Sequence, residues 1–188
     1  MTSDNCRYCG IDLAGSSSPC LQCRERNNVV EKFVAIGPWE EKLREYVSLY
    51  KYGGDRRLAR WMIDHLFLIW KENWDGIPVM PVPPRAARLR EEGFDPVGYL
   101  AAGLSKRGVP VVKLLRRKGN LSQKQLNREE RLSEIALNFV LKRNTGFLPR
   151  KIVLLDDIST TGTTIQVCAR ILRGAGVQNV YAMVICKD

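Results

Sequence analysis

The chain has 188 residues, of which 45% are hydrophobic and 27% are charged, a balance typical of globular proteins and unlike that of disordered ones. No apolar run approaches the roughly 20 residues that a membrane-spanning helix needs, and the first residues lack an apolar targeting core, so we expect a cytoplasmic protein. The net charge of +10 favours partners that carry phosphate, either small molecules or nucleic acid, with a solvated basic face as an equal alternative.

Four of the six cysteines lie near the beginning of the chain, as the two C-x-x-C pairs Cys6/Cys9 and Cys20/Cys23. In a reducing compartment such pairs favour a metal over disulfides, and four thiolates complete a tetrahedron around Zn²⁺. A site without an open position is structural, and the metal supplies the folding energy of a segment that has no core. The alternative is a tail with redox-reactive thiols. We therefore predict a zinc-ribbon module over residues 1–27 and a second domain over residues 28–188.

Strand and helix patterns alternate along the rest of the chain. We expect strands over residues 29–36, 77–83, 109–115, 135–142, 151–157 and 177–187. We expect helices over residues 38–52, 56–72, 97–107 and 163–176, and a polar loop that turns into a helix over residues 116–131. This alternation predicts an α/β domain with a mainly parallel sheet.

Two adjacent carboxylates, Asp156 and Asp157, close the predicted strand over residues 151–157, in the stretch KIVLLDDISTTGTT. In an open parallel sheet, ligands bind beyond the carboxyl ends of the strands. Carboxylates at such an end accept hydrogen bonds from two neighbouring hydroxyl groups or help to hold Mg²⁺. The alternative is an ordinary acidic turn followed by a threonine helix cap.

A turn rich in hydroxyl groups follows the two carboxylates and leads into the next helix. Its members are Thr160, Thr161, Gly162, Thr163 and Thr164. Backbone N–H groups at a helix start and threonine hydroxyls form a cradle for phosphate, and glycine lets the backbone approach the anion. Phosphoribosyl pyrophosphate, with a phosphate, a diol and a metal-bound pyrophosphate, matches both features. The sequence has no G-x-x-x-x-G-K-[ST] loop, which disfavours a nucleoside triphosphatase.

The stretch IVLLDDISTTGTT resembles the signature of type I phosphoribosyltransferases. The resemblance implies that Asp156 and Asp157 hold the ribose hydroxyls as the catalytic pair, and that the turn over residues 160–164 binds the 5′-phosphate. Purine-salvage members carry an acidic residue at the first position of that turn. Thr160 stands there in this sequence, which argues against hypoxanthine or guanine as the acceptor.

Motifs along nearly the whole chain follow the order of the ComF-type competence family, which they resemble. These motifs are the four cysteines, YKYGGDRRLARWM, MPVPPRAARLREEGFDPVGYLA, LRRKGNLSQKQLNREERLSEIALNFVLK and the final acidic motif. The resemblance implies a type I phosphoribosyltransferase fold fused to a zinc ribbon, with phosphoribosyl pyrophosphate and Mg²⁺ as ligands, an unknown acceptor and a link to DNA uptake. Candidate partners are single-stranded DNA and other competence proteins such as a helicase. The alternative function is a non-catalytic single-strand-binding accessory or a ligand-sensing regulator.

Two basic segments are candidates for contacts with pyrophosphate. Arg85, Arg88 and Arg90 follow the strand predicted over residues 77–83, and Arg116 and Arg117 open a basic stretch that resembles the mobile hood of phosphoribosyltransferases. A solvated loop and a nucleic-acid contact are the alternatives for that stretch. The family pattern R-G-F-N-Q is EGFDP over residues 92–96 here, so Glu92 replaces an arginine. This departure favours the non-catalytic alternative, and the intact acidic pair favours the enzyme.

Overall fold

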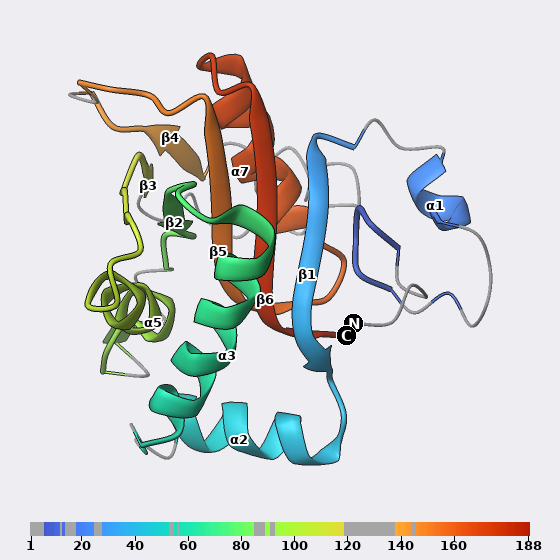
Figure 1. Ribbon diagram of the computed structural model, residues 1–188, viewed down its shortest axis with the longest axis vertical. Coiled ribbons are helices and arrows are strands. Elements are labelled where there is room, and N and C mark those ends of the chain that lie inside the picture. Colours follow the sequence, from blue (N-terminus) through green and yellow to red (C-terminus); the bar gives the residue numbers. More distant parts are fainter. Residues whose placement is uncertain are drawn as a thin grey trace.

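The computed structural model describes residues 6–11, 13, 18–24, 28–52, 55, 57–84, 89–90, 93–118, 138–143 and 146–188. The helices are α1 (Leu21–Arg24), α2 (Glu41–Lys51), α3 (Arg57–Trp74), α5 (Pro96–Ser105) and α7 (Thr163–Gly174) (Figure 1). The strands are β1 (Val30–Pro38), β2 (Val79–Pro81), β3 (Leu115–Arg117), β4 (Phe139–Leu141), β5 (Lys151–Ser159) and β6 (Asn179–Lys187). No helix in these ranges is long and apolar enough to cross a membrane.

Four strands form one parallel sheet in the order β1-β6-β5-β2. An isolated parallel bridge from Val79 to Val111 adds a further segment on the outer side of β2. β3 and β4 make a separate antiparallel pair. Strand β5 is apolar without a break before its acidic end because both of its faces are covered by helices. The predicted fold class, α/β with a mainly parallel sheet flanked by helices, is confirmed.

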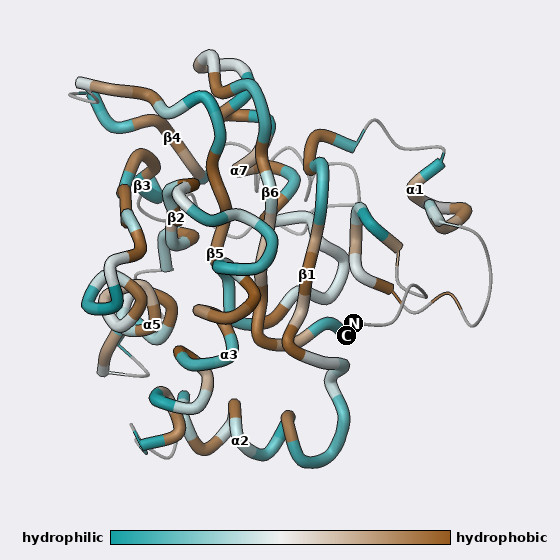
Figure 2. The backbone as a smooth tube through the Cα atoms, viewed as in Figure 1, coloured by the Kyte–Doolittle hydropathy of each residue, from teal (hydrophilic) through white to brown (hydrophobic). Residues whose placement is uncertain are grey.

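Two hydrophobic cores lie on opposite faces of the sheet. On β5, Val153 and Leu155 pack into the core shared with α2, α3 and α5. Ile152 and Leu154 pack into the core shared with α7 on the other face. Figure 2 shows the hydrophobic residues concentrated along β5 and β6 at the centre of the molecule. The side chains of β5 thus alternate between the two helical layers, as a strand requires.

The predicted elements differ from the observed ones mainly at their ends. The strand predicted over residues 109–115 is reduced to the bridge at Val111, and β3 begins only at Leu115. The edge of β2 that meets Val111 ends at Pro81, which has no N–H to donate to a longer ladder. Pro38 was predicted to start a helix, but it is the last residue of β1, where it still pairs with Lys187 of β6. Most of the predicted loop and helix over residues 116–131 lies outside the described residues.

Candidate functional site

The connections that follow the adjacent strands β2 and β5 run in opposite directions along the sheet. After β2 the chain passes through α5 to the Val111 bridge on the outer side, whereas after β5 it passes through α7 to β6 on the inner side. α5 and α7 also cover opposite faces of the sheet. Such a reversal opens a crevice beyond the carboxyl ends of the two adjacent strands. The acidic end of β5 lies at this reversal, which is where ligands of open α/β sheets bind.

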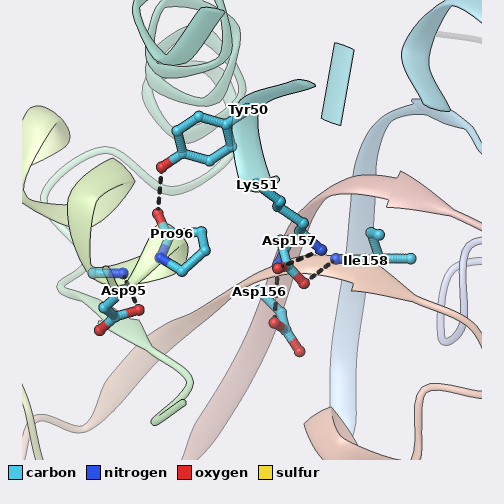
Figure 3. A network of polar contacts seen from close by, with 8 residues as sticks. Tyr50, Lys51, Asp95, Pro96, Asp156, Asp157 and Ile158 are labelled. Atoms are coloured by element: carbon cyan, nitrogen blue, oxygen red, sulfur yellow. Dashed lines mark hydrogen bonds and ion pairs between the residues drawn. The ribbon is translucent and has the colours of Figure 1, made fainter. Parts of the chain in front are cut away.

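The structure separates the two aspartates that the sequence analysis treated as equals (Figure 3). Asp157 is 2% exposed, and its Oδ2 lies 2.7 Å from Nζ of Lys51, which is itself 3% exposed. Its Oδ1 accepts a hydrogen bond of 2.6 Å from the backbone N–H of Ile158. Asp156 is partly exposed, and its Oδ1 accepts a hydrogen bond of 2.9 Å from the backbone N–H of Asp157. Of the pair, Asp156 is therefore the one that solvent reaches.

Lys51 is a site residue that the sequence analysis missed. It lies in the last turn of α2, where a lysine ordinarily points into solvent and complements the helix dipole. The adjacent Tyr50 is also fully buried, and its hydroxyl donates a hydrogen bond of 2.7 Å to the carbonyl of Pro96 at the start of α5. The charges of Lys51 and Asp157 both affect the thiol of Cys186 in β6. The pKa of this thiol is raised to about 12, chiefly by burial, while Lys51 lowers it and Asp157 adds to the rise.

The threonine turn over residues 160–164 leads from the end of β5 into α7, and its role as a phosphate loop stays a prediction. Gly162, with a φ of 72°, is the N-terminal cap of α7 and brings no side chain over the first amides of that helix. The hydroxyl groups of Thr161 and Thr163 are 2.8 Å apart, and Nζ of Lys187 donates to the carbonyl of Thr160 at 2.7 Å. Below the turn, the buried hydroxyl of Ser159 has no hydrogen-bond partner within the described part of the chain. Buried hydroxyls without a partner are uncommon in proteins, so Ser159 marks this strand end as polar beneath its surface.

Replacing Gly162 with alanine tests whether the turn depends on its left-handed backbone. We expect Gly162→Ala to lower the free energy of unfolding by about 1–2 kcal/mol, because a Cβ disfavours this conformation. Gly174→Ala, at the end of the same helix, is the matched control, since its added Cβ meets no atom within 4 Å. Urea unfolding followed by tryptophan fluorescence measures both variants. Equal stability changes in the two variants would mean that the turn imposes no backbone constraint.

A cavity of about 370 Å³ lies beside β2 and is lined mainly by basic side chains and prolines. Its lining includes the basic residues Lys113, Arg116, Arg117, Lys118 and Lys142, the residues 81–84 and the single carboxylate Asp95. The cavity adjoins the acidic strand end, because the N–H of Val82 donates to the carbonyl of Leu155 at 2.9 Å. Positive charge next to a carboxylate suits a ligand that carries both pyrophosphate and hydroxyl groups.

The predicted arginines have different positions. The guanidinium of Arg117 lies 4.6 Å from the centre of the Phe139 ring, and Arg116 is exposed. Burial raises the pKa of the Cys168 thiol on α7, Asp156 raises it further and Arg117 lowers it, so both of these charges lie near that thiol. Arg90 is exposed. The predicted residues Arg85, Arg88 and Glu92 lie outside the described residues.

The four N-terminal cysteines form a compact cluster, in which the Sγ atoms all lie within 4.8 Å of one another. The Sγ atoms of Cys9 and Cys20 are 3.8 Å apart, and a tetrahedron of Zn–S bonds near 2.3 Å separates its sulfurs by about 3.8 Å. N–H donors, including that of Cys20, outweigh burial and lower the pKa of the Cys6 thiol to about 7, whereas burial raises the pKa of the Cys9 thiol to about 11 and also raises that of Cys23. The cluster thus fits a structural zinc ion held by all four thiolates.

The cysteine cluster rests on the first strand of the sheet. The backbone N–H of Phe33 in β1 donates to the carbonyl of Arg7 at 2.7 Å. A Cβ added to Gly10, whose φ is 74°, would come within 2.4 Å of the Phe33 ring. Figure 1 shows the N-terminal segment beside β1 at one edge of the sheet. The boundary between residues 27 and 28 stays a prediction, and the described contacts join the two parts.

Comparison with known proteins gives two relatives that match nearly the whole chain. Competence protein ComFC of Streptococcus pneumoniae is 29% identical over 179 residues, which are 94% of this chain and 78% of that protein. Competence protein F of Haemophilus influenzae is 27% identical over 187 residues, which are 93% of this chain and 81% of that protein. A scan against models of protein families found no match.

Among solved structures, the similar ones include two phosphoribosyltransferases. Adenine phosphoribosyltransferase of Saccharomyces cerevisiae has a TM-score of 0.45 and 16% identity, and the similarity covers 73% of this chain and 72% of that one. Hypoxanthine phosphoribosyltransferase of Staphylococcus aureus has a TM-score of 0.44 and 12% identity, covering 69% and 63%. By its motifs, its four-cysteine cluster and its similarity over nearly its whole length to two competence proteins, the chain resembles the ComF-type competence family.

Proposed function

We propose that this protein binds phosphoribosyl pyrophosphate with Mg²⁺ in the crevice beyond β2 and β5 and transfers the phosphoribosyl group to an acceptor. One observation carries the proposal. A partly exposed carboxylate, Asp156, lies at the reversal of the chain connections; in the chain it follows Leu155, which contacts Val82 of the basic cavity, and it precedes the threonine turn that is bent at Gly162. Each of the three features matches one part of this ligand.

The residues have distinct tasks in this proposal. The turn over residues 160–164 and the first amides of α7 receive the 5′-phosphate. Asp156 accepts hydrogen bonds from the ribose hydroxyls, and the side chains of Arg116 and Arg117 face the pyrophosphate from the cavity. The four cysteines form the one cluster of at least three metal-ligating side chains in the described ranges. Mg²⁺ therefore arrives with the ligand's own phosphates, as is usual for this ion.

The proposed reaction is a substitution at C1 of the ribose. The bond from C1 to the pyrophosphate oxygen breaks, the pyrophosphate leaves with the bonding electrons, and a nucleophile of the acceptor forms the new bond to C1. The basic side chains of the cavity stabilise the charge on the leaving group, and Mg²⁺ adds to this when it is bound with the ligand. The carboxylate of Asp156 orients the ribose and offsets positive charge that develops on the ring.

The relatives' names associate them with competence. For this chain we propose a role in DNA uptake, which its resemblance to the ComF-type competence family implies. A second candidate function is binding of single-stranded DNA without chemistry. The exposed basic side chains of Arg116 and Lys118, beside the cavity, favour it. A DNA-binding protein of this kind keeps its affinity when Asp156 is neutralised and loses affinity steeply as salt rises.

The variant Asp156→Asn tests the proposed site directly. We expect it to weaken binding of phosphoribosyl pyrophosphate in the presence of Mg²⁺ by about 100-fold, the loss of two charge-assisted hydrogen bonds. Its stability should stay close to that of the wild type, because Asp156 is partly exposed. Calorimetric titration gives the affinity, and release of pyrophosphate with candidate acceptors gives the turnover.

The matched control is Asp75→Asn, which removes a carboxylate that is 53% exposed and paired with Lys71 on the surface. We expect the control to bind like the wild type. Equal affinities of Asp156→Asn and the wild type would contradict the assigned site. Binding by the wild type without pyrophosphate release would leave a ligand sensor instead of an enzyme.

A further inference from the structure

We infer that the two adjacent aspartates have different roles: Asp156 contacts the ligand, whereas Asp157 is held inside the protein by Lys51, which acts as a positioning residue for the strand end. This inference deepens the proposed function and rests on it. The sequence resemblance assigns both carboxylates to the ribose. The geometry points to one carboxylate for the ribose and a buried ion pair behind it.

Both oxygens of Asp157 already have partners inside the protein. Oδ2 lies 2.7 Å from Nζ of Lys51, and Oδ1 accepts the N–H of Ile158 at 2.6 Å. The two charged side chains are 2% and 3% exposed, so a ligand cannot reach Asp157 without displacing Lys51. Removing Lys51 from the pair would leave a buried carboxylate without its counter-ion, which is strongly unfavourable. The contacts that Asp157 makes without a ligand therefore stabilise the folded protein.

Asp156 lies on the other side of the strand. Its position in the strand puts it on the same face of β5 as Ile152 and Leu154, which pack into the core with α7, the helix that begins at the threonine turn. Its Oδ1 is held by the N–H of Asp157, so the direction of the Asp156 carboxylate depends on where the Asp157 peptide lies. The ion pair between Lys51 and the Asp157 side chain holds that peptide in place from the opposite face of β5. Lys51 thus acts on the ligand through Asp157 and Asp156 without touching it.

The end of α2 fixes both walls of the crevice at once (Figure 3). Lys51 holds the end of β5, while Tyr50 next to it holds the carbonyl of Pro96 at the start of α5. Asp95, just before that proline, caps α5 by accepting the N–H of Gly98 at 2.9 Å, and it also lines the basic cavity. Two neighbouring residues of one helix therefore set the distance between the acidic strand end and the cavity wall.

The test is a set of variants at the ion pair, measured with phosphoribosyl pyrophosphate and MgCl₂ by calorimetry. Lys51→Met leaves Asp157 without its counter-ion, and the double variant Lys51→Gln with Asp157→Asn replaces the ion pair by two neutral amides of similar size. Ile69→Ala, a cavity variant in α3 with no polar contact to the site, controls for lost stability. Hydrogen exchange of the amides at residues 157–159 reports on the strand end without any ligand.

We expect Lys51→Met to bind the ligand at least 10-fold more weakly and the double variant to recover most of that loss. Ile69→Ala should bind like the wild type although it is destabilised. Amide exchange at residues 157–159 should rise more in Lys51→Met than in Ile69→Ala. A double variant that binds as weakly as Asp156→Asn would show that Asp157 contacts the ligand, and would overturn the division of roles.

Failure of the proposed function gives a different pattern of results. If the wild type binds no phosphoribosyl pyrophosphate, the proposed function is wrong, and so is the proposed contact of Asp156 with this ligand. The exchange measurement still decides the role of Lys51, because it needs no ligand. Equal exchange in Lys51→Met and Ile69→Ala would overturn Lys51 as a positioning residue, whatever the protein binds.

Discussion

Removal of zinc is expected to unfold the N-terminal module and to loosen the strand on which it rests. The four thiols lie within 4.8 Å of one another, and the binding energy of a structural zinc ion, about 10–16 kcal/mol, is the folding energy of such a segment. The purified protein should contain about one zinc ion per chain. After chelation or in Cys6→Ser, we expect loss of the metal and rapid proteolysis near the N-terminus. Metal analysis and limited proteolysis measure both effects.

The expected disturbance extends to β1, because the carbonyl of Arg7 accepts the N–H of Phe33 and Gly10 packs on the Phe33 ring. Faster amide exchange at Phe33 should therefore accompany metal loss. Cys168→Ala is the matched control, since this cysteine of α7 is buried in the core and, in the part of the chain that the structure describes, belongs to no cluster of metal-ligating side chains. A metal-free protein with an intact, protease-resistant N-terminal segment would contradict the structural role of the metal.

Lys51→Met is expected to cost about 3–5 kcal/mol of unfolding free energy, because it leaves the buried carboxylate of Asp157 without its counter-ion. That is a large part of the total stability of a domain, which is typically about 5–15 kcal/mol. Urea unfolding followed by circular dichroism measures the change. The neutral pair, with Lys51→Gln and Asp157→Asn together, should recover much of the loss, since it leaves no charge without a partner.

The surface ion pair between Lys71 and Asp75 gives the control for this effect. Its atoms are 2.6 Å apart, as close as those of the buried pair, but its side chains are 58% and 53% exposed. We expect Lys71→Met to change the stability by less than about 1 kcal/mol, because water and salt screen an exposed pair. Similar costs for Lys51→Met and Lys71→Met would mean that burial does not strengthen the contact.

The sequence was sufficient to locate the candidate site but not to orient its side chains. Local patterns in the chain were enough for three features. These are the apolar run before Asp156, the alternation of strands with helices, and the glycine in the threonine turn. The strand was predicted to end at Asp157, whereas β5 continues to Ser159. Because Asp156 and Asp157 are adjacent in one strand, the period of two places their side chains on opposite faces.

Lys51 could not have been identified in this way, because its partner is distant in sequence. A lysine in the last turn of a helix ordinarily complements the dipole at the surface, and no local pattern marks it as buried. The start of α5, in contrast, has a local signal in the sequence, the pair Asp95–Pro96. It was seen as a departure from the family pattern, but an aspartate followed by proline is also a good helix start, and α5 begins there with Asp95 as its cap.

The strand order has a consequence for how the chain is made. β1 is the first strand of the sheet to leave the ribosome, but its partner in the sheet is β6, the last strand of the chain described here. The edge of β1 that pairs with β6 therefore stays without its partner strand until residues 179–187 have been synthesised. Such long-range closure slows folding and exposes the nascent chain to aggregation. A fragment that stops before β6 should accordingly fail to fold, however complete its ligand-binding residues are.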